Sequence, residues 1–185
     1  GAQDVCAEDN GAFTGEVSAS MLIDFGCRFV IVGHSERRLY YGENDALIAR
    51  KCEKALALGL IPILCVGETE SEKVKHLTKQ VIGRQLSFVL EHLGVEAFDK
   101  IVVAYEPIWA IGTGLIASPE EAEEAHCFLR SQVAEKSEAV AKKMRILYGG
   151  SLKANNASAL FAMPNINGGL VGGASLDAKE FLSIA

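Results

Sequence analysis

Short apolar runs alternate with longer helical stretches along the whole chain, and this alternation limits its fold more than any other feature. The runs are rich in β-branched residues and lack polar alternation, which is typical of strands buried on both faces of a parallel sheet. Residues 1–5 are expected to form the tail of one strand, and five further strands are expected at 29–32, 61–66, 101–104, 145–148 and 170–171. The sequence therefore predicts six strand-then-helix units, in a single domain over residues 1–185.

The helical stretches carry local signals for their ends. Ser118 is a capping residue, Pro119 suits the first helical position, and Glu121 completes a capping box. A last helix is expected to begin near Ser175 and to run to the end of the chain.

Two helices are expected to show apolar faces. One helix carries apolar residues at a spacing of four, which are Val17, Met21 and Phe25, and it is ended by Gly26. The other is capped by Asn44 and ended by Gly59, with Leu47, Leu56 and Leu58 facing inward.

Composition excludes several classes of protein. The formal net charge of −6 and the lack of a Lys/Arg run argue against a nucleic-acid partner. No apolar run approaches the length that crosses a membrane, so no membrane partner is expected. The five cysteines are odd in number and lack CxxC spacing, which favours reduced thiols in a cytoplasmic protein over a zinc site, so no metal is expected.

Polar and Gly-rich clusters follow the predicted strands. They lie at 8–11, 33–38, 67–69, 106–107, 149–151 and 172–175. The periodicity indicates an α/β protein with parallel strands and leaves doubly wound and barrel folds open. In a barrel the carboxyl ends of the strands meet on one face, where the active sites of such folds are built. Any single cluster could be an ordinary turn.

Five of these segments resemble triosephosphate isomerase. They occur in the order of that family and span nearly the whole chain, at 7–16, 32–38, 104–114, 148–151 and 168–175. The resemblance implies a TIM (β/α)8 barrel family fold. It also implies an aldose-ketose isomerase of glycolysis and gluconeogenesis that needs no cofactor. Such an enzyme interconverts dihydroxyacetone phosphate and D-glyceraldehyde 3-phosphate, a small phosphorylated triose substrate, by proton transfer through an enediolate.

The resemblance assigns roles to three residues of the predicted rim. Glu106 resembles the general base, His34 the neutral group that donates a hydrogen bond to the substrate carbonyl, and Glu36 a supporting carboxylate. Taken without the motifs, each has a plainer interpretation. A carboxylate after a strand is usually solvated or caps a helix, a histidine is usually structural, and Glu36 could form an ion pair outside the chemistry.

The resemblance also implies a closing lid over residues 107–117, made chiefly of Pro107, Ile108, Trp109, Ala110, Ile111, Gly112, Thr113 and Gly114. Such a lid would suppress loss of phosphate from the enediol. Gly112 would contact the substrate phosphate together with Ser151, Gly172 and Gly173. Leu115 stands where many family members have Lys, from which we expect altered lid dynamics at most. A surface loop around a packed Trp is the alternative interpretation.

Thr14 would lie near the tip of a loop, residues 11–16, that inserts into a neighbouring subunit in the family's dimer. An ordinary polar turn competes with this interpretation. No lysine of residues 1–185 matches the context of the family's catalytic lysine, which suggests that the first two strand-helix units lie outside this sequence. We therefore expect very weak or absent activity for this polypeptide, and a homo-oligomer formed through exposed edge strands or partial disorder near those edges.

Two other functions remain open on the sequence. The first is a non-catalytic scaffold of six strand-helix units that self-assembles or binds phosphate ligands. The second is another barrel enzyme acting on a phosphorylated metabolite, which the combined segments around His34 and Glu106 disfavour.

Overall fold

The computed structural model describes residues 1–112 and 115–185, and its centre is one parallel sheet. Its strands are β1 (Phe29–Val32), β2 (Ile61–Val66), β3 (Val102–Tyr105) and β4 (Ile146–Tyr148). They lie side by side in the order of the sequence, β1-β2-β3-β4. A doubly wound sheet reverses its strand order at a switch point, so the observed order favours the barrel type of winding that was left open above.

Two single-residue bridges extend the sheet at its two sides. Ala2 pairs with Val30 beside β1, and Gly169 pairs with Tyr148 beside β4, both in parallel. The six segments therefore lie side by side in the order of the sequence, although the last bridge is at Gly169, just before the predicted run at 170–171. The outer two, however, are bridges rather than strands in the described part of the chain, because each has a sheet neighbour on one side only.

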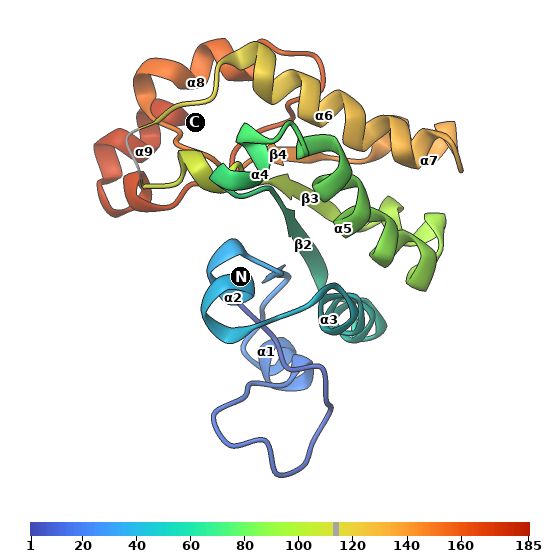
Figure 1. The fold of residues 1–185 in the computed structure, drawn as a ribbon. Helices are drawn as coiled ribbons and strands as arrows, with labels where there is room; N and C mark the ends of the chain where they lie inside the picture. The colour runs from blue at the N-terminus through green and yellow to red at the C-terminus, as the bar shows by residue number, and fades with distance from the viewer. Residues whose placement is uncertain (113–114) are drawn as a thin grey trace.

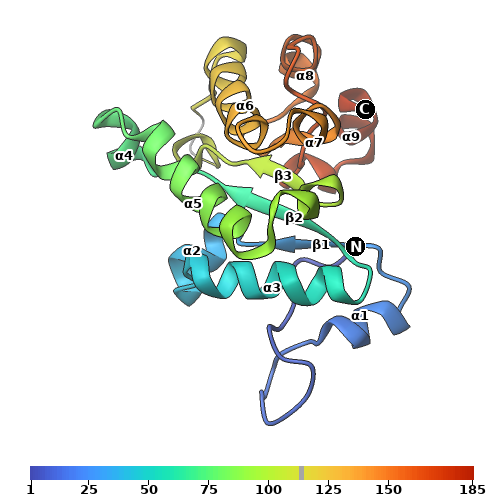
Figure 2. The same cartoon turned by 90° about the vertical axis from the view of Figure 1, so that its right-hand side faces the viewer.

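Helices of very different lengths connect and cover the strands. The α-helices are α1 (Ala19–Asp24), α2 (Ser35–Tyr41), α3 (Asp45–Ala57), α4 (Glu70–Val74), α5 (Thr78–Leu93), α6 (Pro119–Ala134), α7 (Glu138–Lys143), α8 (Ala154–Phe161) and α9 (Ala178–Ile184). Three short 3₁₀ segments accompany them: η1 (Val95–Asp99), η2 (Ile108–Ala110) and η3 (Gly173–Leu176). Helices α3, α5 and α6 pack against one another in turn around the outside of the sheet (Figures 1 and 2).

The core lies between the sheet and these helices. Val30, Val32 and Leu64 point toward the helices and are fully buried, whereas Ile31 and Ile63 on the opposite face are only half-buried. The prediction of burial on both faces is therefore correct for β3, where every residue is buried, and wrong for the first half of the sheet. The reason is that the described residues close the concave face of the sheet only in part.

The predicted helix start at Ser118 is confirmed. Its hydroxyl accepts a hydrogen bond from the Glu121 backbone N–H, and the Glu121 carboxylate accepts one from the Ser118 N–H. Asn44 likewise caps α3 by accepting from the Leu47 N–H.

The inward faces of two helices differ from the prediction. Helix α3 packs mainly through Ile48, Cys52 and Ala55; of the three predicted residues, Leu56 is partly buried against the core, Leu47 is half-buried, and Leu58 is 44% exposed. Helix α1 packs through Ala19 and Leu22, and the predicted stripe of Val17, Met21 and Phe25 faces outward, with Phe25 89% exposed. Both helices carry two apolar rows, and local spacing does not show which of them meets the sheet.

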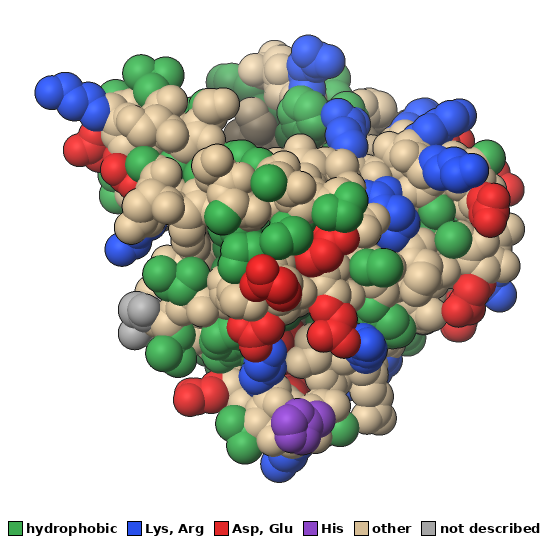
Figure 3. Space-filling view, turned by 90° about the horizontal axis from the view of Figure 1, so that it is seen from above, with side chains coloured by type: hydrophobic (Ala, Val, Ile, Leu, Met, Phe, Trp, Pro, Cys, Tyr) green, Lys and Arg blue, Asp and Glu red, His purple; other side chains and the backbone are tan. Residues whose placement is uncertain are grey.

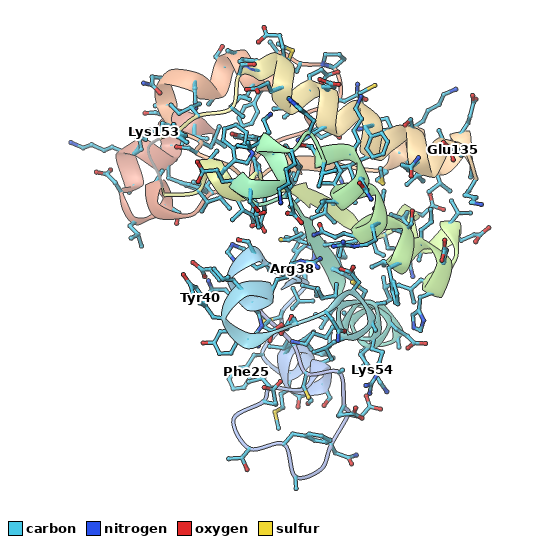
Figure 4. All side chains as sticks on the ribbon, in the orientation of Figure 1. Phe25, Arg38, Tyr40, Lys54, Glu135 and Lys153 are labelled. Atoms are coloured by element: carbon cyan, nitrogen blue, oxygen red, sulfur yellow. The ribbon has the colours of Figure 1, made fainter. Side chains whose placement is uncertain are left out.

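Residues 9–17 form an exposed segment that projects from the molecule below α1 in Figure 1. Thr14 lies within this segment, flanked by Gly11 at φ 129° and Gly15 at φ 93°. Figure 4 shows Phe25 beside α1 and Tyr40 on α2, both large side chains that the described residues leave exposed.

The described residues also bear on charge and on membranes. The face seen in Figure 3 carries acidic, basic and apolar side chains close together. None of the helices in residues 1–112 and 115–185 is long and apolar enough to cross a membrane. All five cysteines are free thiols, and three of them, Cys6, Cys52 and Cys65, are buried.

Candidate active site

A cavity of about 900 Å³ opens beside the carboxyl ends of the strands. Seven residues that the sequence singled out line it: His34, Glu36, Glu106, Gly112, Ser151, Gly172 and Gly173. They come from the segments that follow β1, β3, β4 and the bridge at Gly169. Parallel strands place their carboxyl ends at one edge of the sheet, which is why residues so far apart in the sequence meet here.

Glu106 is the buried carboxylate of this cavity. It follows β3 directly, and its backbone N–H continues the sheet by donating to the Val66 carbonyl at 2.8 Å. Its side chain is 3% exposed; Oε2 accepts from the Ser35 N–H at 3.1 Å, and Oε1 lies 3.0 Å from His34 Nε2. The carboxylate is therefore held by two partners from the segment after β1.

His34 has opposite hydrogen bonds at its two ring nitrogens. It caps α2, and its Nδ1 accepts from the backbone N–H of Glu36 at 3.3 Å. The ring proton therefore belongs on Nε2, which donates to Glu106. The hydrogen bond and the charge of Glu106 raise the pKa of His34, while burial of the ring opposes this rise. With its proton on Nε2, the imidazole donates to the Glu106 carboxylate at the cavity.

Glu36 lies farther out than the other two. Its side chain is 68% exposed, and its carboxylate is 3.7 Å from His34 Nδ1. That charge makes a small contribution to the raised pKa of His34. Glu36 thus lies at the cavity rim, beside His34.

Glycines at the ends of β2 and β4 make room for Glu106. A Cβ on Gly67 would lie 1.8 Å from the Glu106 carbonyl oxygen, and one on Gly149 would lie 2.8 Å from Glu106 Cγ. By contrast, a Cβ on Gly172 or Gly173 would meet no atom within 4 Å, so their backbone borders open cavity. The first pair of glycines is needed for packing, and the second leaves space for a ligand.

The segment after Glu106 is anchored by a residue that sequence reasoning did not single out. Glu68 is fully buried and accepts from Trp109 Nε1 at 2.8 Å and from the Tyr105 hydroxyl at 3.1 Å. Burial and the Glu68 charge raise the pKa of Tyr105 far above its usual range, so Tyr105 stays a donor. The only sequence signal was the polar cluster at 67–69, which follows β2.

The predicted lid residues are placed as follows. Ile108, Trp109 and Ala110 form η2, and Ile111 and Gly112 line the cavity. Thr113 and Gly114 lie outside the described residues. Leu115 is about half exposed.

Comparison with known proteins decides the family. The family model described as triosephosphate isomerase matches residues 1–185, the whole chain. The chain belongs to the triosephosphate isomerase family. It is thereby a member of a family of isomerases, and the parallel α/β fold agrees with that assignment.

Individual relatives give the same result. The chain is 59% identical over 184 residues to a triosephosphate isomerase of Nitrosococcus oceani, covering 100% of this chain and 74% of the relative. It is 56% identical to one from Cupriavidus pinatubonensis, with 100% of this chain and 75% of the relative covered. A third, from Thiobacillus denitrificans, is 58% identical, with coverages of 100% and 74%.

Proposed function

We propose that this site interconverts dihydroxyacetone phosphate and D-glyceraldehyde 3-phosphate, a reaction of glycolysis and gluconeogenesis, through an enediolate. The observation that carries the proposal is the pairing of a buried Glu106 carboxylate with the Nε2–H of His34 inside a glycine-lined cavity. Proton transfer between adjacent carbons needs one carboxylate that takes and returns the proton and one donor at the carbonyl oxygen. This family is itself a standard example of such a pairing.

The resting geometry requires Glu106 to move before it can act. Both of its oxygens are occupied, by His34 and by the Ser35 N–H. A bound substrate would take over the His34 Nε2–H with its carbonyl oxygen and so release the carboxylate toward the carbon acid. Pro107 follows Glu106 directly, so the displacement would be transmitted to η2 and to the lid. Glu36 would support His34 from the rim.

The phosphate group would lie against the open backbone at Gly172 and Gly173, with Ser151 and Gly112 beside it. Backbone N–H groups without a nearby Cβ suit a dianionic phosphate. Closure of residues 107–114 over the bound triose would exclude water and retain the enediolate.

The polypeptide of residues 1–185 taken by itself should turn over very slowly or not at all. The cavity is bordered by Arg37, which is already held by Asp4 and Glu43, and by Lys153, which lies exposed at the rim. Losing one preorganised electrostatic group in an active site costs about 10²–10³ in rate. The half-buried concave face of the sheet supports the same expectation, because water reaches it.

We also propose that this polypeptide is a cytoplasmic homo-oligomer. The exposed segment around Thr14 and the outward-facing Phe25 offer one surface, and the one-residue bridges at Ala2 and Gly169 offer sheet edges to another copy. Free thiols at all five cysteines suit a reducing compartment. Light scattering should give a mass above one chain; a compact, well-ordered monomer would contradict the proposal.

Steady-state isomerisation of glyceraldehyde 3-phosphate tests the function. Glu106→Ala, purified identically, is the control against traces of a host isomerase, and Glu138→Ala on exposed α7 is the matched surface variant. Activity that survives in Glu138→Ala and disappears in Glu106→Ala would support the proposed chemistry. Its size relative to a full-length relative would test the expected weakness.

Equal background in all three proteins would instead favour the non-catalytic scaffold. Calorimetric titration with inorganic phosphate would then show whether the glycine-lined part of the cavity still binds an anion. A Gly173→Ala variant provides the reference for that titration, since its Cβ would project into the open space there.

A further inference from the structure

Helix α4 stands beside the start of the lid segment. It follows β2 and begins with a capping box between Thr69 and Glu72. It packs against η2 (Figure 1). One of its side chains, Lys73, holds its ammonium 4.8 Å from the centroid of the Trp109 ring. This distance is within the range of a cation–π contact.

The same ammonium also reaches the far end of the lid segment. Lys73 Nζ lies 2.9 Å from Glu121 Oε1, in the first turn of α6. The other oxygen of Glu121 accepts from the Ser118 N–H, which directly follows the last lid residue, Ala117. Lys73, first, and the Ser118 N–H, second, lower the pKa of Glu121, so this carboxylate is charged at neutral pH.

A single side chain therefore contacts both ends of one segment. Trp109 lies at its amino-terminal end, and the Ser118–Glu121 cap forms its carboxyl-terminal end. Trp109 is also fixed by Glu68, which comes from the connection between β2 and α4, as Lys73 does from α4 itself. Both ends of the segment therefore contact side chains from one short stretch of chain, which runs from the end of β2 through α4.

We propose that Lys73 is a positioning residue that couples Trp109, at the start of the 107–117 segment, to the Ser118–Glu121 cap at its end, and sets how readily these two ends move away from α4. The inference rests on the proposed function in treating the segment as a lid. Lys73 is not among the described residues that line the cavity, so it would act through Trp109 and Glu121 and not on substrate.

The sequence makes a direct test possible, because Trp109 is the only tryptophan in the chain. In Lys73→Met, acrylamide quenching of Trp109 fluorescence and hydrogen exchange of the 107–117 amides should both increase, by about threefold, as the loss of two modest, partly exposed contacts implies. Lys79→Met is the matched control, since Lys79 also pairs with a glutamate of α6, Glu124 at 2.8 Å, but lies on α5, whereas the contact with the Trp109 ring is made by Lys73 on α4. Lys73→Arg should remain near the parent protein, because a guanidinium both stacks on a ring and pairs with a carboxylate.

A second variant tests the coupling itself. Glu121→Gln keeps a capping box, because Gln also serves at that position, but removes the charge that holds Lys73. If Lys73 joins the two ends, Glu121→Gln should raise quenching of Trp109 although the substitution lies in α6. Equal quenching in Glu121→Gln and the parent, or equal behaviour of Lys73→Met and Lys79→Met, would overturn the proposal.

These readouts do not depend on turnover, so they can fail or succeed separately from the isomerase assay. Where activity is measurable, Lys73→Met should change kcat and KM together, as expected for a residue that acts on lid motion. Loss of activity in Glu106→Ala with unchanged quenching of Trp109 would leave the role of Lys73 standing on its own observations.

Discussion

At the scale of single residues, the proposed chemistry depends on the hydrogen bonds made by the two ring nitrogens of His34. Its Nδ1 accepts from a helix N-terminus, and its Nε2 donates to Glu106. A raised pKa in the folded state means that this contact stabilises the protein at low pH, below the unfolded pKa of the ring. The stabilisation is lost as pH rises through the folded pKa. The pKa of His34 therefore depends directly on the neighbouring Glu106 carboxylate.

Glu106→Gln should lower the pKa of His34. The substitution weakens the hydrogen bond to Glu106, which is the main cause of the raised pKa, removes the carboxylate charge that adds to it, and leaves burial, which acts in the opposite direction. NMR titration of the imidazole would measure the change. Glu36→Gln should produce a smaller decrease, because that carboxylate is more exposed and contributes least. An equal decrease in the two variants would contradict the assigned geometry.

Gly67→Ala should destabilise the fold by at least about 2 kcal/mol, because its Cβ would lie 1.8 Å from a backbone oxygen that cannot move independently. Gly173→Ala, with no atom within 4 Å, should stay within about 0.5 kcal/mol of the parent while weakening phosphate binding. Urea unfolding separates the two. A stable Gly67→Ala would show that β2 and β3 can shift apart at their ends.

At the scale of elements, the sequence predicted where α3 and α6 begin, but it did not predict correctly which face of α1 is buried. The capping box of α6 depends on residues three apart, so spacing alone identified it. The choice between the two apolar rows of α1 depends on where the sheet lies, and the more hydrophobic row, with Phe25, turned outward. Helix α3 shows a similar contrast, with a confirmed cap at Asn44 and a predicted face of which Leu56 meets the core and Leu58 does not.

Ser118→Ala should cost about 1 kcal/mol of stability, since the N–H of Glu121 loses its acceptor at the start of a 16-residue helix. Ser131→Ala, an exposed position within the same helix whose hydroxyl donates to the Phe128 carbonyl, should be nearly neutral. Thermal unfolding of both variants would measure the difference, and equal melting temperatures would argue against the cap.

At the scale of the whole molecule, buried charge and buried histidine tie distant segments together. Lys51 on α3 is buried between Asp4 and Glu43 and so joins the first residues of the chain to this helix. His126 is fully buried against Tyr105 and bonds to the Asn165 carbonyl, which links α6 to β3 and to the segment after α8. Both contacts span large sequence separations.

His126 should make the protein sensitive to acid. Burial lowers its pKa from 6.5 to about 4, so the unfolded chain binds the proton more readily between these values. The contribution of His126 to stability should therefore fall as pH drops from about 6.5 to about 4, by roughly 3 kcal/mol in total. Urea unfolding over this range should show a flatter profile for His126→Phe, whereas His92→Phe, at an exposed pair with Glu53, should retain the parent slope.

The sequence by itself determined the succession of strands and helices along the chain, the helix caps at Asn44 and Ser118, and the residues that meet at the cavity. Strand and cap signals are local, and parallel strands bring their carboxyl ends together whatever their length, so Glu106 and His34 could be placed on one rim. Only the tertiary structure decided that Glu68 anchors Trp109, that Lys73 reaches both ends of the lid segment and that Phe25 faces outward. These contacts join residues many positions apart, and their energy depends on burial and distance in space, which no local period of the sequence encodes.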